Sequence, residues 1–135
     1  MRVYAETLDS EAYKPSDNVV ITLKMANGSI GSITYVAGGD KSYPRERVEV
    51  FGGCAVGVID NFKAATFVQK GRSRCTRNWL GVDRRHRGEL GALLEAIRSG
   101  DRLPVEFEEY LYTTLATFAM ERSLREGVPM AVEIG

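Results

Sequence analysis

The sequence has little of the residue types that most often carry chemistry. Its 135 residues include two cysteines, one histidine and one tryptophan. Cys54 and Cys75 lack metal-ligand spacing and are too few for a disulfide framework. No apolar run approaches the roughly 20 residues of a membrane-spanning helix, and the first residues contain no signal-peptide core. We therefore expect a cytoplasmic protein with reduced thiols that contacts no membrane.

Charge of one sign is also missing, since 18 basic and 18 acidic residues give a formal net charge of zero. This balance argues against a general nucleic-acid binder, whose affinity comes from neutralising phosphates. The basic residues between Lys70 and Arg87 surround Trp79, as in some single-strand binders. We interpret this stretch as a solvated loop and expect no nucleic-acid partner. An anionic small ligand, gripped by arginine, and a nucleic-acid module are the alternatives.

Sequence motifs of the common enzyme classes are absent. There is no G-x-G-x-x-G, no Walker loop, no G-x-S-x-G and no H-E-x-x-H. His86 has the pKa range of a general base and Asp83 could orient it, but no nucleophile accompanies the pair. A residue at a helix entry is the favoured interpretation of His86. We therefore expect no catalytic, cofactor-binding or metal-binding residue in this chain.

The first half of the chain alternates between apolar and polar residues. Val19, Ile21 and Leu23 share one face of a strand, which is the period-two pattern. Asn27-Gly28 predicts a hairpin, because both residues tolerate φ > 0. Further strands are expected at 3–8, 30–37, 47–51, 54–59 and 62–69, followed by an irregular stretch at 71–87. These strands lie too close together for helical crossovers, which indicates antiparallel pairing.

The second half changes to helical periodicity. Leu90, Leu93, Leu94 and Ile97 lie at i, i+3, i+4 and i+7, and a longer stripe runs from Phe107 to Phe118. Gly127 and Pro129 end the second helix, and 128–134 is expected to be a last strand. Strands followed by helices predict an α+β fold: a single domain, 1–135, with an open, mainly antiparallel sheet and two α-helices packed on one face.

Two helices can cover only one face of such a sheet. The other face is expected to carry Val20, Thr22, Ile30, Thr34, Val36, Ala65 and Phe67. These side chains are too apolar for a simply solvated face, and soluble monomers rarely expose large apolar patches. We therefore expect a homo-oligomer joined through this open face.

The segment 41–46 is the most polar connection between two expected strands. It places Lys41, Tyr43 and Arg45 in a turn, and binding residues are often found in such loops. An exposed hairpin with a turn fixed by Pro44 explains the same residues. The residues themselves leave both interpretations open.

Several short segments together resemble a known family. Asn27-Gly28-Ser29-Ile30-Gly31 with Ile33-Thr34-Tyr35 is similar to the D-G-S-x-G-x-I-x-Y hairpin of Gfo/Idh/MocA oxidoreductases. Residues 44–52 resemble their P-K-E-R-x-E-V-x-G strand, and 83–90 their D-K-G-H-x-x-E-L segment, with Arg85 in place of glycine. Residues 115–119 and 121–125 resemble the closing helix. The resemblance runs in order from about Asp17 to the end of the chain.

The resemblance implies the C-terminal substrate-binding and oligomerisation domain of an NAD(P)-dependent sugar or polyol oxidoreductase. NAD or NADP is then bound in the intact parent by an N-terminal Rossmann domain absent from this fragment, which alone binds no cofactor and is inactive. In this family, the corresponding positions face the substrate. The resemblance therefore implies that a sugar-like small molecule is bound by Tyr35, Lys41, Tyr43 and Arg45. The alternative is a stand-alone, non-catalytic binding or scaffold domain of the same fold.

Overall fold

A computed structural model of the chain describes residues 1–8, 17–77, 86–102 and 105–133. The chain divides into two units, Met1–Gly39 with Gly100–Gly135, and Asp40–Ser99. Each unit contains a four-stranded antiparallel sheet, and the described residues form two α-helices. The predicted α+β class and antiparallel pairing are thus confirmed. The strands are divided between two sheets rather than one, because β3 and β4 are joined by ten residues and belong to different hydrogen-bonded ladders.

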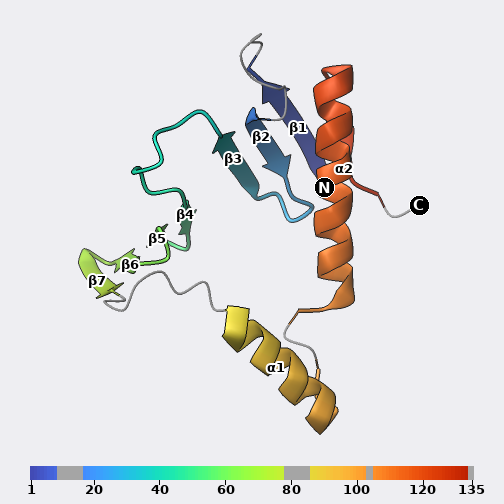
Figure 1. Cartoon of the computed structure of the whole chain (residues 1–135). Coiled ribbons are helices and arrows are strands. Elements are labelled where there is room, and N and C mark those ends of the chain that lie inside the picture. Colours follow the sequence, from blue (N-terminus) through green and yellow to red (C-terminus); the bar gives the residue numbers. More distant parts are fainter. Residues whose placement is uncertain (9–16, 78–85, 103–104, 134–135) are drawn as a thin grey trace. The chain divides into compact units, whose positions relative to one another are not determined.

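The first unit has its sheet in the order β3-β2-β1-β8, formed by Ile30–Val36, Asn18–Lys24, Arg2–Thr7 and Met130–Ala131 (Figure 1). The predicted hairpin joins β2 to β3, with Ile21 opposite Ile33. Within this hairpin turn, Gly28 is the residue with positive φ, at 88°. The Asn27 side-chain carbonyl accepts the Ser29 N–H at 3.0 Å. The hairpin prediction is therefore confirmed. The two residues have different roles from those expected, because Gly28 adopts the left-handed backbone and Asn27 contributes a side-chain hydrogen bond instead.

Helix α2, Phe107–Glu126, packs along β1 and β8 and covers one face of this sheet (Figure 1). The core consists of buried apolar side chains from the strands, the helix and the C-terminal segment, namely Val3, Ala5, Val19, Ile21, Ala119, Met130 and Val132. Helix α2 ends as predicted at Gly127, whose φ is 68° and whose N–H donates to the Ser123 carbonyl at 2.8 Å. The last strand is shorter than expected and comprises only Met130–Ala131.

The buried stripe of α2 lies further along the helix than its apolar pattern predicts. Phe107, Tyr110 and Phe118 are more than half exposed. The residues that pack on the core are instead Leu115, Ala116, Ala119, Met120 and Leu124. A helix of 20 residues is about 30 Å long, whereas strands of six or seven residues span about 20 Å. The sheet can therefore cover only the C-terminal turns of α2.

Ser123 is a fully buried polar residue in the centre of this packing. Its hydroxyl oxygen accepts the Ala5 N–H at 3.0 Å, and its hydroxyl donates to the Val128 carbonyl at 2.7 Å. Strand β8 pairs only with Arg2 and Val3 of β1. Ala5 lies beyond the end of that short ladder, so the helix supplies the hydrogen-bond partner that a longer strand would have supplied.

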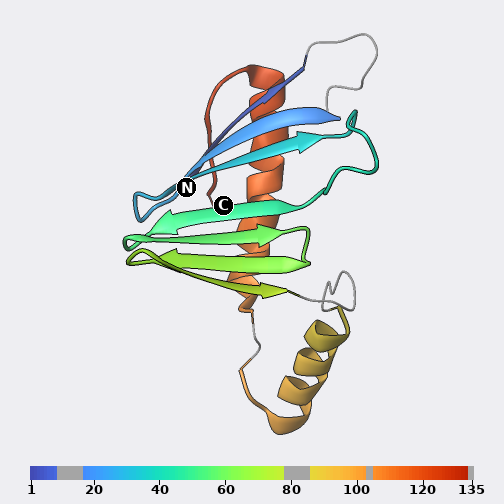
Figure 2. The ribbon, with the colours of Figure 1, turned by 90° about the vertical axis from the view of Figure 1, so that its left-hand side faces the viewer.

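The second unit contains a four-stranded meander, β4-β5-β6-β7, formed by Arg47–Gly52, Ala55–Asp60, Ala64–Gln69 and Arg72–Arg77 (Figure 2). Helix α1, His86–Ser99, follows. Connections of two or three residues join the strands, and positive φ occurs at Gly53-Cys54, Asn61-Phe62 and Lys70-Gly71. A left-handed backbone at two consecutive turn residues is typical of type I′ turns. The twist of such turns matches the twist of the paired strands.

Strand β7 corrects the prediction that 71–87 is irregular. Its sequence, Arg-Ser-Arg-Cys-Thr-Arg, has no apolar alternation and gives no strand signal. Its backbone is nevertheless paired with β6 along its whole length, from Gln69 opposite Arg72 to Ala64 opposite Arg77. The Lys70-Gly71 turn imposes this pairing, because a tight turn brings whatever follows it back along the preceding strand.

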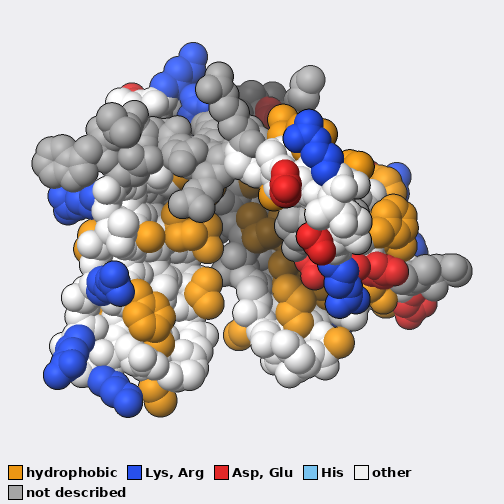
Figure 3. Space-filling view, turned by 90° about the horizontal axis from the view of Figure 1, so that it is seen from below, with side chains coloured by type: hydrophobic (Ala, Val, Ile, Leu, Met, Phe, Trp, Pro, Cys, Tyr) orange, Lys and Arg blue, Asp and Glu red, His pale blue; other side chains and the backbone are white. Residues whose placement is uncertain are grey.

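Side chains of the second unit are largely open to solvent. Among the residues that the structure describes between 40 and 99, only Ala96 is buried. Large apolar side chains lie on the molecular surface in Figure 3. The predicted apolar stripe of α1, comprising Leu90, Leu93, Leu94 and Ile97, is between 39% and 65% exposed.

The open-face residues predicted from the sequence fall on two different sheets. Val20 is paired with Thr34, and Thr22, Ile30 and Val36 lie on the same side of the first sheet, opposite to α2. Ala65 and Phe67 lie in β6 of the second sheet. The first sheet's open face also carries Arg2, Tyr4, Glu6, Lys24 and Ser32, so its apolar side chains are interspersed with polar ones.

Candidate functional site

The connection between β3 and β4 is organised by Asp40. Its carboxylate accepts the Ser42 N–H at 2.8 Å and the Ser42 hydroxyl at 2.7 Å, while its carbonyl accepts the Tyr43 N–H at 3.1 Å. These bonds form an Asx turn, in which an aspartate side chain takes the place of a backbone acceptor. The Ser42 hydroxyl, and then its N–H, lower the pKa of the Asp40 carboxyl, because both bonds favour the charged form.

This turn presents the three predicted binding residues of the connection. Lys41, Tyr43 and Arg45 occupy alternate positions after Asp40 and are all exposed, with Tyr43 at 75%. An ammonium, a phenol and a guanidinium are donors suited to sugar hydroxyls, carboxylates or phosphates. None of the three is held by a side-chain hydrogen bond or ion pair among the residues that the structure describes. The group is therefore available to a ligand.

Tyr35, the fourth predicted binding residue, lies elsewhere. It belongs to strand β3 of the first unit, opposite Val19, and is 56% exposed. Val19 lies on the α2 side of that sheet, so Tyr35 does too. The Tyr35 side chain is exposed to solvent because α2 packs on β1 and β8 and leaves the edge strand β3 uncovered. Tyr35 is thus in a different unit from Lys41, Tyr43 and Arg45.

An ion pair that the sequence analysis overlooked lies where β4 begins. The Arg47 guanidinium contacts the Glu49 carboxylate at 2.6 and 3.1 Å. The two residues are two positions apart on one strand, so their side chains share a face. This hydrogen bond, and then the carboxylate's charge, raise the pKa of Arg47. The i, i+2 spacing of opposite charges on a predicted strand is the signal that would have found the pair.

Among the described residues, no parallel strand pair leads into a helix in the way that a nicotinamide-binding site requires. A dinucleotide pyrophosphate is held where a parallel strand turns through glycines into a helix N-terminus. Every strand pairing in the described part of the chain is antiparallel. Nor do three or more His, Cys, Asp or Glu side chains come together for a metal ion among residues 1–8, 17–77, 86–102 and 105–133.

The side chains of His86, Trp79 and Asp83 lie outside the description, so the hypothesis about His86 is neither supported nor opposed. Of the described helices, neither is long and apolar enough to cross a membrane.

Comparison with known proteins identifies the class of fold. No family model matches the sequence, and no curated protein matches it either. Solved structures do match. An oxidoreductase from Agrobacterium radiobacter, in complex with NAD+, L-tartaric acid and magnesium, superimposes over 97% of this chain with a TM-score of 0.75 and 13% identity. Levoglucosan dehydrogenase with NADH gives the same TM-score over 98% of the chain, at 17% identity. The WlbA dehydrogenase from Bordetella pertussis, with NADH and UDP-GlcNAcA, gives 0.58 over 99%, at 20% identity.

These structures are oxidoreductases of the Gfo/Idh/MocA type, the family that the sequence motifs resemble. The likeness establishes that this chain has the fold of one part of such enzymes. The chain covers 43%, 44% and 39% of the three structures, which is about two fifths of their length.

Proposed function

We propose that this chain is the substrate-binding sheet domain of an NAD(P)-dependent sugar or polyol oxidoreductase. The observation that supports the proposal is a match over nearly the whole chain to about two fifths of several dehydrogenases. One of them, levoglucosan dehydrogenase, also has a structure with NADH and L-sorbose. In the proposal, a Rossmann-type domain outside these 135 residues holds the nicotinamide, and the sheet domain positions the substrate.

In the proposed role the Asp40 turn is the binding element. Lys41 and Arg45 donate to hydroxyl or carboxylate oxygens of the substrate, and Tyr43 supplies a ring and a hydroxyl. The Asx turn supports this role because it fixes the backbone while leaving the three side chains free. Tyr35, in the first unit, remains a predicted substrate-binding residue. None of the four is assigned a proton-transfer step, so the catalytic acid or base belongs to the rest of the enzyme.

The genomic sequence upstream of Met1 tests the proposal directly. An in-frame strand followed by G-x-G-x-x-G and, further on, E-K-P would support it, because these segments hold the dinucleotide. In that longer protein, replacing Lys41, Tyr43 and Arg45 together by alanine is expected to raise KM or lower kcat. A gene without those segments, together with sugar binding by the 135-residue chain itself, would favour a stand-alone binding domain instead.

We also propose self-association through the open face of the first sheet. Val20, Ile30 and Val36 are 51%, 77% and 60% exposed there, and a two-fold axis would make this one patch self-complementary. Phe67 is left out of the interface, because its cross-strand partner is Arg74 and two copies would bring arginines together. Sedimentation equilibrium at tens of micromolar is expected to show a dimer or tetramer.

Val20→Lys with Val36→Lys should dissociate that assembly, since both changes place charges on the buried patch. The matched control is Val48→Lys with Val50→Lys, which adds the same charges to the exposed second sheet. A wild-type monomer, or equal dissociation by both pairs, would contradict the proposal.

A further inference from the structure

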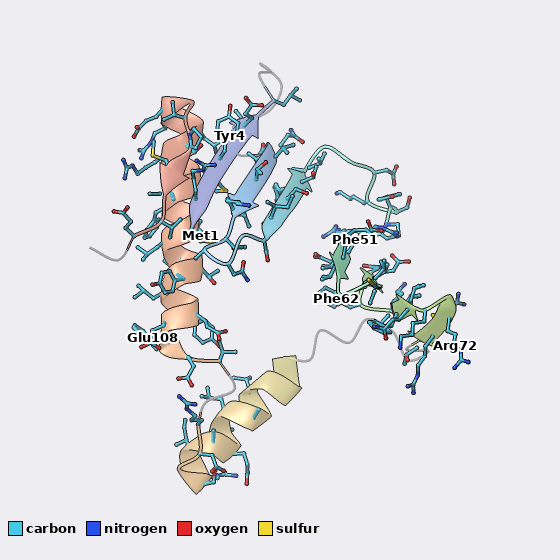
Figure 4. The ribbon with its side chains drawn as sticks, turned by 180° about the vertical axis from the view of Figure 1, so that it is seen from behind. Met1, Tyr4, Phe51, Phe62, Arg72 and Glu108 are labelled. Carbon is cyan, nitrogen blue, oxygen red and sulfur yellow. The ribbon has the colours of Figure 1, made fainter. Side chains whose placement is uncertain are left out.

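Strands β6 and β7 carry a concentration of basic side chains on one face. The register places Arg74 opposite Phe67 and Arg72 opposite Gln69, so these four side chains share a side of the sheet. Arg72 and Arg74 are two residues apart on one strand, about 7 Å along it. Lys70 lies in the connecting turn. Figure 4 labels Arg72 at this hairpin, where side chains extend away from the ribbon.

Among the described residues of the four strands, none on this face is acidic. The remaining residues of the sheet on this side are Val48, Val50, Gly52, Ala55, Gly57, Ile59, Ala65 and Thr76. The two acidic residues of the meander, Glu49 and Asp60, lie on the opposite face, where Glu49 already pairs with Arg47. In the described part of the chain, no ion pair involves Lys70, Arg72 or Arg74. Three positive charges therefore lie together with no acidic partner among the residues that the structure describes.

The same residues border a hollow in the surface. Its volume is about 650 Å³, and its lining consists of Phe67, Gln69, Lys70, Arg72, Ser73 and Arg74. This volume lies within the range of small-molecule sites. Phe67 is 50% exposed and offers a flat apolar surface beside two guanidinium groups. Aromatic rings stack on such a surface, and guanidinium groups bind phosphate oxygens through paired hydrogen bonds.

The turn that carries Lys70, like the other turns of the meander, has a left-handed backbone. Lys70 has φ of 49° and Gly71 of 72°. A left-handed backbone is less favourable for lysine than for glycine or asparagine. A lysine here adds a third charge to the hollow at some expense in local stability.

We propose that this hollow binds a phosphorylated small molecule with a flat ring, of which a nucleoside diphosphate is the simplest example. Arg72, Arg74 and Lys70 bind the phosphates, Phe67 stacks on the ring, and Gln69 donates to or accepts from its polar edge. The site is separate from the Asp40 turn, since β4 and β7 are opposite edges of the sheet. It goes beyond the proposed substrate role and does not depend on it.

Calorimetry on the 135-residue chain tests the proposal, with ADP, pyrophosphate and adenosine as probes. ADP is expected to bind at concentrations below about 1 mM, and adenosine far more weakly. Arg72→Gln with Arg74→Gln should lower the affinity for ADP by about tenfold or more, because charged hydrogen bonds to phosphate are lost. The matched control is Arg47→Gln with Arg77→Gln, which removes two charges from the opposite face of the same sheet. It should change the affinity by less than about threefold.

Two further variants separate the parts of the site. Phe67→Leu should weaken ADP binding by about fivefold and leave pyrophosphate binding unchanged, since only the ring loses its stacking partner. Lys70→Asn removes a charge while keeping a residue that tolerates the left-handed turn, so it should weaken both ligands without unfolding the hairpin. Amide chemical shifts of the unmodified chain provide a readout independent of any variant, and ADP should move those of residues 67–74.

Several outcomes would overturn the proposal. If neither ADP nor pyrophosphate bound at about 5 mM, the basic residues would serve only to prevent β7, an edge strand, from pairing with another sheet. Equal losses from the two double variants would indicate non-specific attraction by charge. A single-stranded oligonucleotide that bound more tightly than ADP, with the same dependence on Arg72 and Arg74, would show a nucleic-acid surface instead.

Discussion

The two units of this chain have sheets of similar size and very different interiors. Both have four antiparallel strands, and most of the strands are six or seven residues long. In the first unit, Val3, Ala5, Val19 and Ile21 are at most 8% exposed beneath α2. In the second, Val50, Phe51 and Phe67 are between 50% and 72% exposed. The backbone ladders are equivalent, and the first sheet owes its buried interior to α2, which packs on it within the first unit.

This difference teaches that strand pairing and stability have separate origins. Hydrogen bonds in a ladder replace hydrogen bonds to water, so their net contribution is small. Burial of apolar side chains supplies most of the driving force. The first unit buries apolar side chains, whereas the second unit has tight turns and a hydrogen-bonded ladder but buries few apolar side chains. We expect the first unit to account for most of the free energy of unfolding.

Removal of the Ser123 hydroxyl should give the largest effect. Ser123→Ala leaves the Ala5 N–H and the Val128 carbonyl without partners inside the first unit. The expected loss is about 2–4 kcal/mol of unfolding free energy, because each buried unpaired group costs about 1–3 kcal/mol. Urea denaturation measures it.

The control is Thr117→Ala on the exposed side of α2, where the hydroxyl only bonds back to the Thr113 carbonyl. That change should be neutral or slightly stabilising, since alanine is the better helix former. Equal losses from the two variants would show that the buried hydrogen bonds of Ser123 have no special importance.

A matched pair of valines compares the two sheets directly. Val19 is 6% exposed in β2, and Val50 is 63% exposed in β4. Val19→Ala should cost about 2 kcal/mol, through lost burial and a small cavity. Val50→Ala should cost less than about 1 kcal/mol. Thermal and urea unfolding of both variants test this. A larger loss at Val50 would mean that the second sheet is covered in solution, and would reverse our comparison.

The Asp40 turn should contribute less to stability than either sheet. Replacing Lys41, Tyr43 and Arg45 together by alanine should change the unfolding free energy by less than about 1 kcal/mol, as is usual for exposed side chains. Their exposure and lack of side-chain partners in the described structure are the reason. A loss of several kcal/mol would show that the turn is structural rather than available for binding.

The smallest predicted effect is a titration. The pKa of Asp40 should lie below its ordinary value of 3.8, because Ser42 hydrogen-bonds its charged form. Because the folded-state pKa of Asp40 is lowered, the stabilisation from its charged form is fully present at pH values above the ordinary pKa. That stabilisation is lost as the pH falls through the lowered pKa. NMR titration of the Asp40 carboxyl should show the shift, and Ser42→Ala should move the pKa back towards 3.8. An unchanged pKa in that variant would contradict the Asx turn.

Local patterns predicted much of this architecture. Alternation identified β2 and its buried face, Asn27-Gly28 located the hairpin between β2 and β3, and Gly127 located the end of α2. Such signals work because turn geometry and side-chain alternation depend on residues only a few positions apart. The resemblance in motifs pointed to the oxidoreductase fold that the structural comparison supports. The binding roles of Tyr35, Lys41, Tyr43 and Arg45 remain predictions.

Other features depended on contacts between distant segments, which no local pattern carries. Strand β7 has no apolar alternation and exists because β6 offers it an unpaired edge. The division into two sheets follows from which strands share hydrogen bonds, and the buried stripe of α2 from how far the short strands extend beneath it. Ser123 reads as an ordinary helix residue in the sequence. Its role arises because β8 is two residues long and leaves the Ala5 N–H, 118 positions away, to be satisfied by a side chain.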